Sequence, residues 1–277
     1  MYHLDLLPGQ VADTIITVGD PERVRAVSRR FDRVELRVEA REFATHTGEI
    51  DGKRLTVIST GIGTDNVDIV LNELDALFNI DLEKRVPRES VTPLTFVRLG
   101  TSGAFQPDLP LGSLLLSEAA LAMDGLLPFY LTTGTPDILA LELQDHLDAG
   151  GQRLPVPPLV VRPDLPPAFA QSNLRRGVTL TASGFYAPQG RSLRLPSGLD
   201  AGLLGRLRNW RSGNLRLTNI EMETAGIYGL AGALGHRSAS VSALLANRAE
   251  RTFYADPAGA IDQLIDRGLE LVLADAQ

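Results

Sequence analysis

The 277-residue sequence contains no cysteine, which excludes disulfide bonds, thiolate metal sites and a cysteine nucleophile. Its four histidines are too widely scattered to resemble a zinc motif, so we expect no metal. The sequence also lacks a Gly-x-Ser-x-Gly nucleophile elbow and a phosphate-loop lysine motif. These absences exclude several covalent and metal-dependent routes, and the missing cysteine fits a reducing cytoplasm.

Long apolar runs are missing as well. Residues 1–18 have no cationic start followed by a continuous apolar region, and no later run is long enough to cross a bilayer. The net charge of -7 and the pI near 5.2 give no broad positive surface for nucleic acid, although a few arginines could still hold one phosphate. We therefore expect a cytoplasmic protein without membrane or nucleic-acid partners.

The composition is that of an ordinary globular protein, with 44% hydrophobic and 22% charged residues. No break in composition divides the chain, so we expect one domain over residues 1–277. The stretch 150–167 is rich in Pro and Gly and is interpreted as a surface excursion rather than a domain linker.

Apolar and β-branched runs alternate with segments of helical periodicity. Strands are predicted at 14–18, 34–47, 54–60, 94–99, 113–117, 178–182 and 239–245. Helices are predicted from Asp20 to Arg30, from a cap at Asp65 to Phe78, and over 223–234 and 258–274. Glycine-bearing turns follow three of the strands, at 19–21, 61–63 and 100–103. This alternation favours an α/β sandwich with a parallel or mixed sheet.

Two carboxylates and a thioether stand together in the segment 220–226, as Glu221, Met222 and Glu223. Acidic residues are rarely buried without partners, and Met offers an apolar surface for a sugar. The segment therefore indicates a sugar pocket at a helix start. A solvent-exposed first helical turn would explain the same residues, because Glu is favourable near the positive end of a helix.

Two arginines are candidates for binding an anion. Gly19 and Arg23 flank a predicted helix N-terminus, which suits an oxyanion, although a well-capped helix would look the same. Arg98 interrupts an apolar strand beside Thr101, so it must either meet a negative partner or point to water from an edge strand.

The loop 185–191 combines an aromatic ring, an amide and a guanidinium in Phe185, Gln189 and Arg191. A planar heterocycle could stack on or contact the ring at its edge, pair with the amide, and have negative charge stabilised by the arginine. An ordinary surface loop with a buried Phe is the alternative.

Taken together, six ordered segments resemble the nucleoside phosphorylase family of the hexameric bacterial type, and within it the uridine phosphorylases. The segments are 19–23, 41–43, 59–63, 98–104, 185–191 and 221–223. The resemblance implies a single-domain three-layer α/β/α sandwich around a mixed, mostly parallel, twisted central sheet. It also implies reversible phosphorolysis of a pyrimidine nucleoside, uridine before others, to free base and ribose 1-phosphate. Inorganic phosphate is the co-substrate and no cofactor is needed.

The resemblance further implies a role for individual residues. Phosphate binding falls to Gly19, Arg23, Arg98 and Thr101, with Arg41 reaching in from a neighbouring subunit. Nucleoside binding falls to His3 from the partner chain and to Thr101, Phe185, Gln189, Arg191, Glu221, Met222 and Glu223. The residues expected to act in catalysis are Arg98, Gln189, Arg191 and Glu223. Shared sites imply a homo-oligomer, either a dimer or a hexamer built as a trimer of dimers.

Several alternatives stay open at this point. Asn247 stands where purine-cleaving relatives place an acidic aspartate, which weakens but does not remove a purine nucleoside phosphorylase. A nucleosidase that uses water, or a non-catalytic nucleoside-binding protein, would also fit the fold. Glu42, Ile62 and Asn66 match positions that hold a monovalent cation in some relatives, but Asn66 replaces the usual serine, so the ion is left open. The segment 79–93 is longer than in the relatives.

Overall fold

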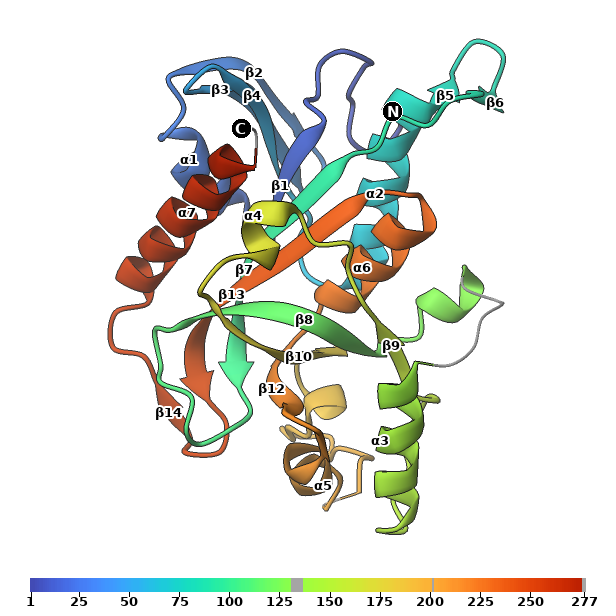
Figure 1. The fold of residues 1–277 in the computed structure, drawn as a ribbon, viewed down its shortest axis with the longest axis vertical. Coiled ribbons are helices and arrows are strands. Elements are labelled where there is room, and N and C mark those ends of the chain that lie inside the picture. The colour runs from blue at the N-terminus through green and yellow to red at the C-terminus, as the bar shows by residue number, and fades with distance from the viewer. Residues whose placement is uncertain (131–136, 201, 276–277) are drawn as a thin grey trace.

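Strands and helices alternate along the computed structural model, which describes residues 1–130, 137–200 and 202–275 (Figure 1). The strands are β1 Thr14–Val18, β2 Arg33–Ala40, β3 Phe43–Ile50, β4 Lys53–Ser59, β5 Ile80–Asp81, β6 Val86–Pro87, β7 Thr95–Ala104, β8 Leu114–Met123, β9 Leu159–Val161, β10 Arg175–Ala182, β11 Arg211–Ser212, β12 Leu215–Glu221, β13 Arg237–Asn247 and β14 Thr252–Phe253. The helices are α1 Pro21–Ser28, α2 Thr64–Asn79, α3 Ile138–Asp148, α4 Pro167–Ala170, α5 Leu203–Asn209, α6 Thr224–Ala233 and α7 Pro257–Ala274, with short 3-10 turns η1 Leu127–Phe129 and η2 Ala187–Gln189. None of the described helices combines the length and apolar character that a membrane span requires.

Twelve strands form one mixed sheet. Strands β4, β1, β7 and β13 form one parallel group, and β8, β10 and β12 form a second. The two groups are joined where β13 runs antiparallel to β8. A further antiparallel pairing of β12 with β7 closes β7, β13, β8, β10 and β12 into a ring. The mixed sheet predicted from the sequence is confirmed, and part of it curls into a small barrel.

Helices cover both faces of the sheet. Successive side chains of a strand point to opposite faces, so Ile15 packs in a core with α2 and α6 while Ile16 packs in a core with α1 and α7. Figure 1 shows these two helix pairs on opposite sides of β1 and β7. A third core packs α3 and α5 against β8, β10 and β12. The predicted three-layer α/β/α arrangement is therefore confirmed.

Strand β7 is longer than the sequence predicts. The small residues at 100–103 were expected to form a turn, but they continue the strand, because Gly100 and Thr101 pair with Ser242 and Ala243 of β13. The predicted turn is therefore wrong. Its backbone groups are satisfied by a neighbouring strand, a long-range pairing that local composition does not reveal.

Two other local predictions are also corrected. The predicted strand 34–47 is divided into β2 and β3 by a tight turn in which Arg41 adopts a left-handed φ of 55°. Helix α2 begins at Thr64, so its N-cap is Gly63 with a φ of 100°, and Asp65 lies inside the first turn rather than capping it. Its negative charge is still favourable at this position, because it lies near the positive end of the helix.

Two segments singled out in the sequence, 79–93 and the stretch 150–167 rich in Pro and Gly, consist mostly of exposed or half-buried residues. Residues 79–93 include a short hairpin of β5 and β6, which projects from the end of α2 (Figure 1). The segment 150–167 contains the short strand β9, which pairs with β8, so this excursion is partly tied to the sheet.

Candidate active site

A cavity of about 900 Å³ opens where β7, β12 and β13 end near the loops that follow β1, β4 and β10. Most of the residues singled out in the sequence line it. They are Gly19, Arg23, Arg98, Thr101, Phe185, Gln189, Arg191, Glu221, Met222 and Glu223. The fold thus brings together segments that are up to about 200 residues apart in the sequence.

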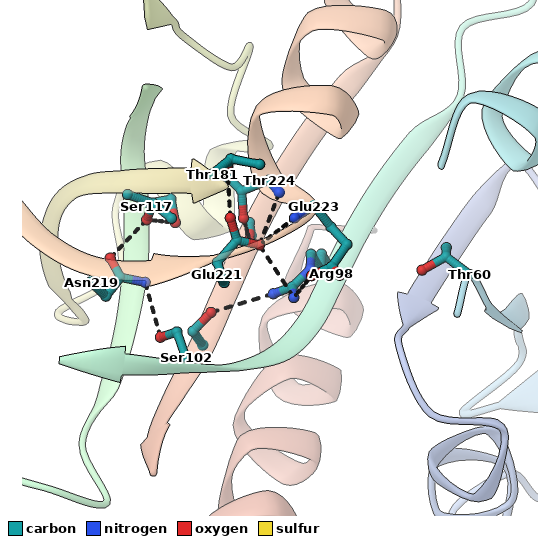
Figure 2. A network of polar contacts seen from close by, with 12 residues as sticks. Thr60, Arg98, Ser102, Ser117, Thr181, Asn219, Glu221, Glu223 and Thr224 are labelled. Carbon is teal, nitrogen blue, oxygen red and sulfur yellow. Dashed lines mark hydrogen bonds and ion pairs between the residues drawn. The ribbon is translucent and has the colours of Figure 1, made fainter. Parts of the chain in front are cut away.

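At the centre of the cavity wall, Arg98 meets two carboxylates (Figure 2). Its Nη2 donates to Oε2 of Glu223 over 2.5 Å and lies 3.3 Å from Oε2 of Glu221. Arg98 is only 4% exposed and lies in β7 between β1 and β13. The alternative of an edge-strand arginine that points to water is therefore wrong.

Burial and the neighbouring charges shift the pKa values of Arg98 and Glu221. Burial alone would lower the pKa of the Arg98 guanidinium, but the charges of Glu221 and Glu223 outweigh burial and raise this pKa above its ordinary value. Burial raises the pKa of Glu221, while Arg98 opposes that rise. The guanidinium is thus held in its charged form by its two carboxylate neighbours.

Glu221 ends β12, and both oxygens of its carboxylate accept hydrogen bonds from the protein. One oxygen accepts from Thr181 Oγ1 over 2.7 Å, and the other accepts from the backbone N–H groups of Glu223 and Thr224, each over 2.9 Å, and faces Arg98. The carboxylate therefore lies at the N-terminus of α6, where unpaired N–H groups attract negative charge. Because it is 5% exposed, the alternative of a solvent-exposed first turn is wrong.

Glu223 connects three parts of the fold. It occupies the N-cap position of α6, and its Oε1 accepts from the backbone N–H of Gly63 over 2.8 Å while its Oε2 accepts from Arg98. Each carboxylate oxygen has two acceptor directions, so one direction on each oxygen stays available for a ligand. That capacity matches a pair of neighbouring hydroxyls.

Arg23 supplies a second guanidinium near Arg98, on a half-buried side chain. Burial lowers the pKa of Arg23, and the charge of Arg98 lowers it further. Its Nη1 donates to the carbonyl of Leu99 over 3.2 Å, whereas its buried Nε has no partner among the described residues. An unpaired buried donor beside a second cation is an arrangement that an anion would satisfy.

The loop before Arg23 has the predicted form. Asp20 caps α1 by accepting from the N–H of Glu22 over 2.9 Å, and Pro21 occupies the first turn. Gly19 lies so close to Gly61 that a Cβ on Gly19 would come within 3.3 Å of the Gly61 carbonyl oxygen. The loops after β1 and β4 therefore form one continuous wall.

At the other end of the cavity, two arginines converge on one amide. Arg191 donates to Oε1 of Gln189 and to the carbonyl of Phe185, each over 2.6 Å, and its guanidinium lies 3.9 Å from the centre of the Phe185 ring. Arg248 also donates to Oε1 of Gln189, over 3.2 Å. Because both donors need an acceptor, the Gln189 oxygen points at them, and its Nε2 is free of partners among the described residues.

Sequence reasoning assigned no role to Arg248, although it noted the neighbouring Asn247. Burial and the nearby Arg191 charge lower the pKa of Arg248 to about 10. The signal that could have found it is position, since Arg248 directly follows β13, whose end lines the cavity. Asn247 itself is buried, and its amide donates to the carbonyl of Gln106 over 3.1 Å.

His3 and Arg41 do not line the cavity of their own chain. The Nδ1 of His3 lies 2.6 Å from Oε1 of Glu73 in α2. The Arg41 guanidinium lies 5.2 Å from the centre of the Tyr2 ring. The structure thus places both side chains outside the cavity, with Arg41 beside Tyr2, the residue that precedes His3.

The three positions compared with a cation site all line the cavity. Glu42 lies in the turn after β2, Ile62 in the loop after β4, and Asn66 in the first turn of α2. Within the described ranges, no cluster of three or more His, Asp or Glu side chains is arranged to hold a metal ion.

Known proteins match the chain over most of its length. The phosphorylase superfamily profile matches residues 13–273. A uridine phosphorylase of Thermococcus kodakarensis is 32% identical over 254 residues, which cover 91% of this chain and 79% of the relative. A uridine phosphorylase of Haemophilus influenzae is 27% identical over 100% of this chain and 97% of its own. The crystal structure of a Trypanosoma brucei nucleoside phosphorylase, described as showing uridine phosphorylase activity, superposes with a TM-score of 0.83 at 27% identity, covering 99% of this chain and 95% of that chain.

Replacing Arg98 with Met should destabilise the protein strongly, because two buried carboxylates would lose their counter-charge. We expect a loss of about 3–5 kcal/mol in the free energy of unfolding near pH 8, measured by urea denaturation. Without the guanidinium, burial raises the Glu221 pKa further, so the folded variant binds a proton that the unfolded chain has released. The difference in the free energy of unfolding between the variant and the parent should therefore become smaller when the pH falls to about 5.5.

The matched control is Arg33→Met, since Arg33 also bridges two carboxylates, those of Glu35 and Glu49, but is 63% exposed. This exposed variant should lose less than about 1 kcal/mol. Equal losses in the two variants, or a deficit in Arg98→Met that does not change with pH, would contradict the buried ion-pair account.

Proposed function

The chain belongs to the phosphorylase superfamily, and on this premise we propose that it is an enzyme that cleaves pyrimidine nucleosides with phosphate, uridine first. The observation that carries this proposal is the combination of two features in one cavity. One is the buried pair of Arg98 and Glu223. The other is the amide of Gln189, which lies between the guanidinium groups of Arg191 and Arg248. Such a cavity holds an anion at one end, a diol in the middle and a carbonyl-bearing ring at the other end.

Phosphate binds, in this proposal, between Arg23 and Arg98, with Gly19 and Thr101 completing the site. The unpaired Nε of Arg23 and the partner-free donors of Arg98 would pair with phosphate oxygens in charge-assisted hydrogen bonds. A phosphate oxygen then attacks C1′ of the ribose. The C1′–N1 bond breaks, its electron pair leaves with the base, and ribose 1-phosphate forms without a covalent enzyme intermediate.

Ribose binds at Glu223, whose two remaining acceptor directions suit the 2′- and 3′-hydroxyls. Met222 contributes an apolar surface for the sugar, and Thr101 reaches the same place from β7. Glu221 also lines the cavity, but its Oε2 accepts from two backbone N–H groups and faces Arg98, and its Oε1 accepts from Thr181. We therefore assign Glu221 to holding Arg98 and the start of α6, rather than to contacting the nucleoside.

The base binds against Phe185, where Gln189 and Arg191 face the developing negative charge. Since Oε1 of Gln189 accepts from Arg191 and Arg248, its Nε2 is the group that would donate to a carbonyl oxygen of uracil. Preorganised donors of this kind stabilise a departing anion without transferring a proton. Asn247 cannot protonate a purine, because its side chain is a neutral amide, and this amide donates to the backbone carbonyl of Gln106.

We further propose that the active enzyme is a cytoplasmic homo-oligomer, in which a neighbouring chain completes each site. Within one chain, the charges of Arg23 and Arg98 are offset by those of Glu221 and Glu223, so a phosphate dianion requires another cation. Arg41 supplies it when contributed by a second subunit. The same contact would bring His3 toward the ribose 5′-hydroxyl.

A nucleoside panel tests the function directly. Uridine, thymidine and inosine are each incubated with and without phosphate, and free base and ribose 1-phosphate are measured. We expect fast, phosphate-dependent release of uracil with an equal amount of sugar phosphate. Base release without phosphate or arsenate would indicate a nucleosidase, faster inosine cleavage a purine enzyme, and binding without release a non-catalytic protein.

Replacing Arg191 with Ala should chiefly lower kcat for uridine, by about 10²- to 10³-fold, because a donor to the departing base is lost. The loss should be smaller for 5-fluorouridine, whose more acidic base needs less help to leave. Arg194→Ala is the matched control, since Arg194 is an exposed arginine in the same loop. A rise in the KM for uridine with unchanged kcat would show that Arg191 binds the ground state and the transition state equally, and would contradict this role.

A further inference from the structure

Gly100 lies on β7, and the guanidinium of Arg98 covers its Cα. The two residues are separated by one position, so their side chains belong to the same face of the strand. The backbone of Gly100 is ordinary strand, paired with Ser242 of β13, and its φ lies outside the left-handed region. Its conformation therefore does not require glycine.

Space is what requires glycine at this position. A Cβ built on Gly100 would overlap Nη1 and Cζ of Arg98 and would come within 2.7 Å of Nη2. Real Cβ atoms do not approach other heavy atoms so closely. The guanidinium thus occupies the volume that any other side chain at residue 100 would fill.

This placement decides where the donors of Arg98 point. By folding back over Gly100, the side chain brings Nη2 to the two carboxylates and Nη1 to within 3.4 Å of Ser242 Oγ. One hydrogen of Nη1 and the Nε hydrogen have no partner among the described residues. A guanidinium pushed off Gly100 would lose both the carboxylate contacts and this presentation of free donors.

We propose that Gly100 is a positioning residue for phosphate use, which acts through Arg98 by leaving the space in which its guanidinium lies. This inference rests on the proposed phosphorolysis. It extends the site to a residue that touches neither phosphate nor nucleoside. Because the effect passes through one side chain, it should vanish when that side chain is removed.

The test is a double-mutant cycle of Gly100→Ala and Arg98→Ala, with uridine cleavage measured over a range of phosphate concentrations. In the parent enzyme, Gly100→Ala should raise the phosphate KM about 10- to 100-fold, as expected for displaced charge-assisted contacts. In the Arg98→Ala background it should change the same constant less than about twofold, since no guanidinium remains to be displaced. Equal effects in both backgrounds would overturn the proposal.

Two further measurements keep the outcome clear. If Gly100→Ala destabilises the parent, it should not destabilise Arg98→Ala further, because the overlap is gone; a double variant that is clearly less stable than Arg98→Ala would contradict the proposal. Gly232→Ala is the control, because Gly232 is exposed in α6 and its Cβ would meet nothing within 4 Å.

Direct binding of inorganic phosphate, measured by calorimetry, separates this inference from the proposed function. Weakened phosphate binding by Gly100→Ala supports the inference even if the parent enzyme cleaves none of the nucleosides tested. Unchanged phosphate binding by Gly100→Ala overturns it, even if uridine phosphorolysis is established.

Discussion

The buried contact of Arg98 with Glu221 and Glu223 is the constraint on which the rest of the site depends. A charge removed from water is tolerated only when it is paired and hydrogen-bonded. Here the pairing requires β7, β12 and the start of α6 to meet at one point, and Gly63 at the start of α2 adds a donor to Glu223. The antiparallel contact of β12 with β7 brings these parts together and closes the barrel.

This group also links the two substrates of the proposed reaction. In this proposal Arg98 binds the anion and Glu223 binds the sugar, and a 2.5 Å hydrogen bond joins the two side chains. Arg23 places a second cation beside the first, and the loop of Gln189 and Arg191 closes the far end of the cavity. Binding and charge stabilisation are thus built from one connected set of protein donors and acceptors, with the protein's part in catalysis being positioning and electrostatics.

Periodicity reports which side of an element is buried, so the sequence pattern predicts an α/β sandwich with a parallel or mixed sheet, whereas the three layers were predicted from the resemblance. The sequence also identifies Arg98 as unusual, since a charge in an apolar strand needs a partner. The partner itself lies more than 120 residues away, so local pattern could not name it. The same limit explains why 100–103 was predicted as a turn, and why Arg248 was missed: both depend on strands that meet only in the folded chain. The residue roles in the cavity come from the resemblance and stay predictions.

The most direct test of this account is a double-mutant cycle between Arg98 and Glu223 on uridine phosphorolysis. Arg98→Ala and Glu223→Ala each remove one side of the same buried contact. If that contact joins the two substrate sites, the double variant should be little worse than the poorer single variant, because the second substitution removes an interaction that is already lost. Effects on kcat/KM that multiply as independent losses would contradict the central claim.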